Sequence, residues 1–306
     1  MGTGWSVRLT PPLEASRSQF QAAIEQELAG VIALFSHWEP SSELSRWNNA
    51  PAGTWAMSEP FWAVLDDAMN LAADTDGAVD PTLGALVDLW GFGPPGPRTS
   101  GLPTDDEIEA ALAVSGWGRL RMVQQGRGLV QPGGMRLDLS GVAKGHAVDR
   151  VSERLTTLGA THHLVEIGGE LRGAGVKPDG LPWWTELETA PGASFPRTLA
   201  ALFDIAVATS GDGERHFEVF GQRYSHTLDG RTGRPIRNGV ASVSVFADTA
   251  LRADALATAL TVMGAEDGAA WAEAMNIAAL FTVRGPEGLT EIITPAAAVM
   301  LEEGAA

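Results

Sequence analysis

The sequence predicts an α+β protein, and two observations lead to this class. Helical periodicity dominates the first part of the chain, residues 1 to about 130, whereas strand-like segments interspersed with helices fill the second part, about 131–306. No linker-like stretch is long enough to separate the parts. We therefore expect a single domain over residues 1–306 in which the two parts are interleaved.

The first part shows helical patterns broken by turn-forming residues. Its expected elements are a strand at 4–10, a helix over 15–38, a polar loop at 39–53, a helix over 59–73, a short helix within a Gly/Pro-rich stretch at 75–103, and a helix over 105–114. Thr104 directly precedes the last of these helices. Its hydroxyl can accept a hydrogen bond from the first turn, so we expect it to be the N-cap.

The second part is richer in alternating apolar residues. Its expected elements are a strand at 135–143, an amphipathic helix from Lys144 to Gly159, strands at 162–176, 183–190, 202–210, 216–229 and 239–247, helices around 251–260 and 268–275, and strands at 277–285 and 290–295. The sequence contains no internal repeat.

Composition excludes several classes of function. The chain has 306 residues, 44% of them hydrophobic, and no cysteine, so it has no disulfide framework and no thiolate nucleophile. A formal net charge of −17 argues against nucleic acid or an anionic membrane as a partner. No apolar run approaches the roughly 20 residues of a membrane span. The first residues lack a signal-peptide pattern, so we expect a cytoplasmic protein as the sequence stands, and an exported one if a signal segment precedes it.

The stretch "DLSGVAKGHAVD" (138–149) joins an expected strand to an expected helix. A glycine-containing turn at a helix start near Lys144 offers backbone N–H groups to a phosphate, and the lysine adds a positive charge. The alternative is an ordinary turn with a solvated lysine. The spacing of the P-loop motif is missing, so this is not a nucleotide-binding loop of that type.

Two further stretches combine glycine with polar residues. "EIGGELRGAG" (166–175) has paired glycines in a strand pattern, which indicates a structural bulge or a close approach of ligand, the bulge being favoured. In residues 208–236, Thr209, Ser210 and Gly211 precede a hairpin in which His226 lies three residues before Asp229. A histidine and an aspartate at a strand end fit general acid–base chemistry, although a lone histidine is more often a surface residue.

The helix "LRADALATAL" (251–260) is apolar except at Asp254 and Thr258. These residues are four apart and therefore share one helix face. A carboxylate and a hydroxyl are hard oxygen ligands of the kind that Mg²⁺ takes together with substrate phosphates. The alternative is an aspartate favoured near the helix N-terminus and a threonine bonded to the preceding turn. If Thr249 caps the helix, Asp254 lies beyond the first turn, which favours the ligand.

The order of these stretches is more specific than any one of them. "MGT" (1–3), "DGAVDPTLGALVDLWGFG", "DLSGVAKGHAVD", "EIGGELRGAG", "ATSGD", "YSHTLDGRTG" and "ADALATAL" together resemble the ApbE family of FAD:protein FMN transferases. The resemblance extends from Met1 to about Gly264 and keeps the family's order.

This resemblance implies an ApbE-like (T-fold-like) fold of mixed sheets with packed helices, and a flavin transferase activity over the whole domain. Members use Mg²⁺ to split the FAD pyrophosphate and transfer FMN to a Thr or Ser hydroxyl of an acceptor protein, releasing AMP. The implied catalytic residues are His226, as the base, together with Asp254 and Thr258, which with the backbone carbonyl of Ala143 would bind the metal. The implied FAD-binding residues are Met1, Gly2, Thr3, Asn48, Asp80, Pro81, Thr82, Asp138, Lys144, Gly168, Gly169, Glu170, Thr209, Ser210 and Gly211.

The sequence departs from the family pattern at two positions: His146 stands where an aromatic residue is usual, and Gly230 where proline is usual. Two other functions remain open at the same site. A Mg²⁺-dependent FAD pyrophosphatase would use water in place of the acceptor hydroxyl and give FMN and AMP. A non-catalytic FAD-binding or carrier protein would need neither the metal ligands nor His226, so their presence argues against it.

Overall fold

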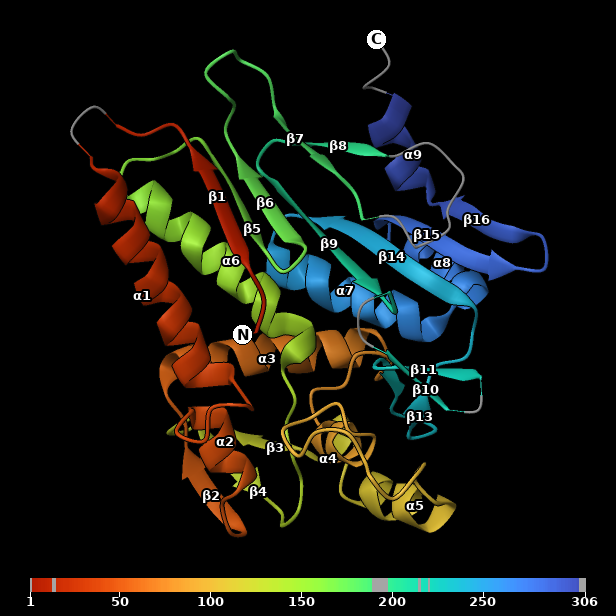
Figure 1. Ribbon diagram of the computed structural model, residues 1–306. Helices are drawn as coiled ribbons and strands as arrows, with labels where there is room; N and C mark the ends of the chain where they lie inside the picture. The colour runs from red at the N-terminus through yellow and green to blue at the C-terminus, as the bar shows by residue number, and fades with distance from the viewer. Residues whose placement is uncertain (1, 13–14, 189–197, 214–215, 220, 303–306) are drawn as a thin grey trace. The chain divides into compact units, whose positions relative to one another are not determined.

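The computed structural model describes residues 2–12, 15–188, 198–213, 216–219 and 221–302, and it confirms the α+β class (Figure 1). The chain divides into two compact units. Unit 1 comprises residues 1–30, 142–214 and 237–306, and unit 2 comprises 31–141 and 215–236. Two of the boundaries fall inside helices, at Gly30–Val31 and at Gly141–Val142, so each unit is assembled from segments distant in sequence.

Unit 1 contains a seven-stranded antiparallel sheet in its described residues. Its strands are β1 (Trp5–Leu9), β5 (His163–Ile167), β6 (Glu170–Ala174), β9 (Ile205–Gly211), β14 (Val240–Ala247), β15 (Ala278–Gly285) and β16 (Gly288–Ile293), and they pair in this order. The expected strand at 162–176 is in fact the hairpin β5–β6. Gly168 (φ 63°) and Gly169 (φ 98°) form its turn, so the bulge favoured from the sequence is wrong.

The helices of the second half of the chain are α6 (Ser140–Thr157), α7 (Ala250–Met263), α8 (Ala265–Ala274) and α9 (Pro295–Glu302), the last of which the sequence did not predict. α7 packs against β9 and β14, behind the sheet in Figure 1. It is buried on nearly every side, which its many alanines permit because they let neighbouring backbones come close. Within the part of the chain that the structure describes, no helix has both the length and the apolar content to cross a bilayer.

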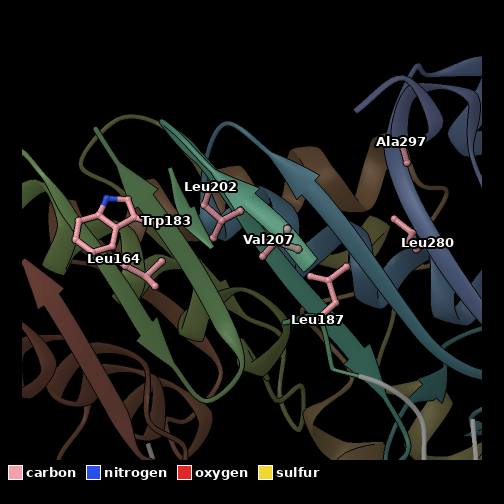
Figure 2. Close-up of a cluster of buried hydrophobic side chains, with 8 residues drawn as sticks. Leu164, Trp183, Leu187, Leu202, Val207, Leu280 and Ala297 are labelled. Atoms are coloured by element: carbon pink, nitrogen blue, oxygen red, sulfur yellow. The ribbon is translucent and has the colours of Figure 1, made fainter. Parts of the chain in front are cut away.

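The opposite face of the sheet is covered by β7 (Trp183–Glu186) and β8 (Leu199–Leu202), which pair antiparallel. Alternate side chains of this pair, including Trp183 and Leu202, pack with Val207 and Leu280 of the sheet in one buried cluster (Figure 2). The strand expected at 183–190 ends at Glu186, and its last two residues lie outside the described ones. The segment expected as one strand at 202–210 is divided between β8 and β9.

Unit 2 is smaller, and most of its elements are short. They are α2 (Glu43–Asn48), β2 (Gly53–Ala56), α3 (Glu59–Asp74), α4 (Gly84–Leu89), α5 (Asp105–Ala113), a 3₁₀ turn at Trp117–Arg119, β3 (Arg121–Val123), β4 (Gly128–Gln131), β10 (His216–Val219), β11 (Gln222–Ser225), β12 (Leu228–Asp229) and β13 (Arg234–Pro235). α1 (Arg17–Phe35) starts in unit 1 and ends in unit 2. Thr104 caps α5 as predicted and forms a capping box with Glu107.

A buried cluster ties the β11–β12 segment to the helices of unit 2. Leu86 and Trp90, at the end of α4, pack with Tyr224 and Leu228. The indole Nε1 of Trp90 also donates to the carbonyl of Gly233 at 2.8 Å. The loop that carries His226 is therefore anchored to α4 from both sides.

Candidate functional site

α6 begins at Ser140 and not near Lys144 as the sequence predicted. The strand expected at 135–143 forms only an isolated bridge between Arg136 and Leu83. Asp138 accepts a hydrogen bond from the backbone N–H of Ser140 at the helix start. Lys144 consequently lies in the second turn of α6, so the helix start expected near Lys144–Gly145 is wrong.

Gly145 is explained instead by a helix crossing. A Cβ at this position would lie 2.2 Å from the carbonyl oxygen of Ala250 and 2.6 Å from the backbone nitrogen of Leu251. Only glycine allows α6 and the start of α7 to approach so closely. The crossing brings Lys144 to the face of α7 that carries Asp254.

Asp254 lies at the centre of a buried polar cluster in unit 1, with a relative exposure of 5%. Its Oδ2 accepts a hydrogen bond of 3.0 Å from the backbone N–H of Gly145, and its Oδ1 lies 3.6 Å from Nζ of Lys144. Lys144 also pairs with the carboxylate of Glu170, at the start of β6. Three elements, α6, α7 and β6, thus contribute one charged group each.

Two carboxyl groups of the cluster face one ammonium. Burial raises the pKa of Asp254, and burial together with the charge of Asp254 raises the pKa of Glu170 to about 8. Burial alone would lower the pKa of Lys144, but the two carboxylates outweigh it and raise that pKa. The lysine therefore stays charged, and a bound cation would favour the ionised form of both carboxyl groups.

Asp254 and Thr258 occupy one face of α7, as predicted. Thr249 caps this helix by accepting from the N–H of Arg252 at 3.2 Å, so Asp254 lies beyond the first turn. The hydroxyl of Thr258 makes no hydrogen bond to any of the described residues. A threonine hydroxyl bonded to the preceding turn, which was the alternative for Thr258, occurs instead at Thr261. Its hydroxyl donates to the carbonyl of Ala257 at 2.7 Å.

The residues fit a hard divalent cation. Glu170 adds a buried oxygen, Oε2, for which the described residues provide no hydrogen-bond partner. Ala143 lies in the first turn of α6, and a helical carbonyl keeps a second lone pair free. Nowhere in the described ranges do three histidine, aspartate or glutamate side chains gather to hold an ion alone. The protein would therefore supply part of the shell, and phosphate oxygens and water the rest, as is usual for Mg²⁺.

Other candidate FAD-binding residues of unit 1 lie near the β5–β6 turn or at the end of β9. A Cβ at Gly168 would lie 2.8 Å from the Thr3 hydroxyl oxygen, so Gly2–Thr3 and the Gly168–Gly169 turn are neighbours. Thr209, Ser210 and Gly211 end β9, and the hydroxyl of Thr209 shares a 2.8 Å hydrogen bond with that of Ser244. Met1 lies outside the described residues.

Several candidate FAD-binding residues belong to unit 2, where they form hydrogen bonds within and between the segments around residues 48, 80–82 and 137–138. Asn48 donates to the carbonyl of Leu137 at 2.9 Å and accepts from its N–H at 2.7 Å. Asp80 accepts from the N–H and hydroxyl of Thr82, and the carbonyl of Pro81 accepts from the N–H of Asp138. The structure thus brings Asp80, Pro81, Thr82 and Asp138 together. The carboxylate of Asp80 is already hydrogen-bonded to Thr82.

His226 lies on a loop of unit 2 next to an aromatic cluster. Its ring makes an edge contact with Phe92, with centroids 6.3 Å apart and planes at 71°. Phe92 in turn contacts Phe217, which stacks on Tyr224. The carboxylate of Asp229 accepts from the N–H and Nε of Arg231 at 2.9 Å each, which closes the turn around Gly230.

Asp149 lies in the stretch 138–149, but its contacts were not predicted from the sequence. This aspartate is buried in α6, and its carboxylate accepts hydrogen bonds from the backbone N–H groups of Ala250 at 3.0 Å and Leu251 at 2.9 Å. It also pairs with Arg172 of β6. The available signal was an aspartate one turn after Gly145 and next to the apolar Ala147 and Val148, because a buried carboxylate requires partners.

Comparison with known proteins identifies the family. The ApbE family model matches residues 1–281. The FAD:protein FMN transferase of Vibrio cholerae is 39% identical over 95% of this chain and 87% of its own length, and that of Escherichia coli K12 is 34% identical over 87% and 77%. The apo form of the Pseudomonas stutzeri flavinyl transferase ApbE superposes with a TM-score of 0.88 at 37% identity, covering 97% of this chain and 92% of that one. The chain therefore belongs to the ApbE family, and its fold is the ApbE fold.

Proposed function

We propose that this chain is an FAD:protein FMN transferase that attaches FMN covalently to a Thr or Ser hydroxyl of an acceptor protein. The observation that carries the proposal is the family match over 281 residues, together with relatives of that name that cover most of the chain. The cluster of Asp254, Thr258, Lys144 and Glu170 gives the proposal a chemical basis, because it combines oxygen donors with two carboxyl groups that a bound cation would ionise.

The reaction breaks the phosphoanhydride bond of the FAD pyrophosphate and forms a phosphoester with the acceptor hydroxyl. The acceptor oxygen attacks the phosphorus attached to riboflavin, the P–O bond to the AMP phosphate breaks, and AMP leaves with the bridging oxygen. His226 would take the proton from the acceptor hydroxyl. Asp254, Thr258 and the carbonyl of Ala143 would hold a Mg²⁺ ion, which supplies charge neutralisation on the pyrophosphate and on the leaving group.

Lys144 would contribute a fixed positive charge next to the metal ligands. Asp254 and Glu170 hold its ammonium in place, so little reorganisation is needed when phosphate charge approaches. We assign the FAD contacts to Met1, Gly2, Thr3, Gly168–Glu170, Thr209–Gly211, Asn48, Asp80–Thr82 and Asp138, as the family resemblance implies. Where a side chain is already engaged, as in Asn48, this role would fall to backbone atoms.

The test is an assay with FAD and Mg²⁺ in the presence and absence of an acceptor. A suitable acceptor is a protein that carries phosphoester-linked FMN when mature, produced in a host without a flavin transferase. We expect AMP release and flavin fluorescence that stays with the denatured acceptor, both dependent on acceptor and metal. AMP and free FMN without acceptor would identify a pyrophosphatase, and tight FAD binding without either product a carrier.

A further inference from the structure

We propose that Asp149 is a positioning residue for the magnesium site, because it fixes the helix that carries Asp254 and Thr258 to the helix that carries Ala143 and Lys144. The inference rests on the proposed function, since it concerns the metal that this function requires. Asp149 is not one of those ligands and acts through the backbone of α7 at Ala250 and Leu251.

The contact between Asp149 and α7 is a helix cap that a residue of another helix, α6, supplies. The first N–H groups of an α-helix have no partner within the helix, and in α7 two of them, those of Ala250 and Leu251, are taken by the two oxygens of Asp149. Thr249 satisfies a third, that of Arg252. Asp149 therefore bonds with both carboxylate oxygens at once, which restricts the rotation of α7 as well as its distance from α6.

A second contact lies one turn away on the same face of α6. Gly145 and Asp149 are four residues apart, and Gly145 meets the backbone at Ala250–Leu251 while its N–H reaches Oδ2 of Asp254. The two contacts fix α7 at its start and one turn later. A small rotation of α7 about either one alone would move the carboxylate of Asp254 and the hydroxyl of Thr258 relative to Ala143.

Asp149 is in turn held by β6. Arg172 pairs with its Oδ1, and Glu170, two residues earlier on the same strand, pairs with Lys144. Because side chains two apart on a strand point to the same face, β6 contacts both ends of the crossing. Removal of the Asp149 charge should therefore loosen the metal ligands without removing any of them.

The experiment measures metal affinity in the full chain by two probes, Mg²⁺ by calorimetry and Mn²⁺ by electron paramagnetic resonance, without FAD. Asp149→Asn keeps the size but places N–H donors against the N–H groups of α7, and we expect about a tenfold or greater loss of affinity, as for other residues that orient metal ligands. Activity should return at saturating Mg²⁺, because the ligands remain. Thr249→Ala is the matched control: it also removes a cap of α7 but no link to α6, so its melting temperature should fall while its metal affinity stays.

Unchanged affinity in folded Asp149→Asn would overturn the inference. If this variant does not fold, Arg172→Gln, at a partly exposed position, decides instead: weaker metal binding supports the inference, and wild-type affinity overturns it. If the wild-type chain binds neither ion, the failure lies with the metal of the proposed function and not with Asp149.

Discussion

The backbone N–H of Gly145 donates to Oδ2 of Asp254 over 3.0 Å, joining two helices whose residues are 109 positions apart. This bond holds one carboxylate oxygen against α6 and turns the other toward Lys144. The carboxylate therefore has a fixed orientation although it lies in the middle of a nearly all-apolar helix. Orientation of this kind is what a metal ligand needs and what a merely tolerated buried aspartate would not require.

Asp254→Asn should abolish transfer while the protein stays folded. The amide oxygen can still accept from Gly145, but the charge that a hard cation requires is lost. We expect the rate to fall on the order of 10²–10³-fold, as when one preorganised electrostatic contact is removed. Since burial disfavours the charged carboxylate, the melting temperature measured in EDTA should stay or rise. A wild-type rate at limiting Mg²⁺ would exclude Asp254 as a ligand.

Thr258→Val should weaken metal binding more than it weakens the fold. Valine has the same shape but no oxygen, and the Thr258 hydroxyl has no hydrogen bond to lose among the described residues. We expect Mg²⁺ affinity to fall by more than about tenfold, because the loss of a residue that only orients a metal ligand already costs about that much.

Thr261→Val is the matched control for this prediction, one turn along the same helix. Its hydroxyl bonds back to Ala257, so the free energy of unfolding should fall by about 1 kcal/mol with Mg²⁺ affinity intact. If Thr258→Val instead lost stability and kept its metal affinity, Thr258 would be a structural residue.

The half-buried His146 and the fully buried His163 should make the protein less stable in acid. Burial lowers the pKa of His146 to about 4 and also lowers that of His163, whose Nε2 shares a hydrogen bond with Ser152 and whose Nδ1 bonds the carbonyl of Ala160. Below about pH 6.5 the unfolded chain takes up protons that the folded chain does not, so the folded state loses stability as pH falls.

For His146 this loss runs from about pH 6.5 down to about 4, at up to about 1.4 kcal/mol per pH unit. Urea unfolding at pH 7 and pH 5 in EDTA measures it, and His146→Phe should reduce the difference between the two pH values. Substitution of the exposed His162 controls for the loss of a histidine as such. An equal difference in wild type and His146→Phe would show that His146 does not contribute.

Local features of the site could be predicted from the sequence, because neighbouring residues determine them. Thr249 caps α7 through a bond to a residue three positions away, and the spacing of Asp254 and Thr258 sets their common face. The cap of α5 at Thr104 is equally local. These features depend only on helix geometry, which the sequence carries directly.

Contacts between distant segments could not be predicted. Gly141 and Gly145 look like a loop because glycine destabilises helices, yet α6 includes both, and Gly145 is required only because the backbone of Ala250 passes there. The backbone N–H groups of α7 that bond Asp149 lie 101 and 102 residues away from it. Gly168–Gly169 was similarly ambiguous, since paired glycines serve a hairpin turn as well as a bulge.

His226→Ala should give a protein that binds FAD but transfers FMN slowly. If the imidazole accepts the acceptor's hydroxyl proton, its loss should cost on the order of 10²–10⁴ in rate. FAD affinity should remain, because the residues assigned to FAD are unchanged. Transfer by the wild type should also fall in acid, where a protonated imidazole cannot act as a base.

His216→Ala is the control for His226→Ala, since His216 belongs to the same unit and contacts Arg223 rather than the Phe92 edge. It should keep the wild-type rate. FAD affinity measured by flavin fluorescence and single-turnover AMP release separate binding from chemistry for both variants. Normal transfer with weakened FAD affinity in His226→Ala would make His226 a cofactor contact. Asp229 would then be the next base to test, although its carboxylate already accepts hydrogen bonds from Arg231.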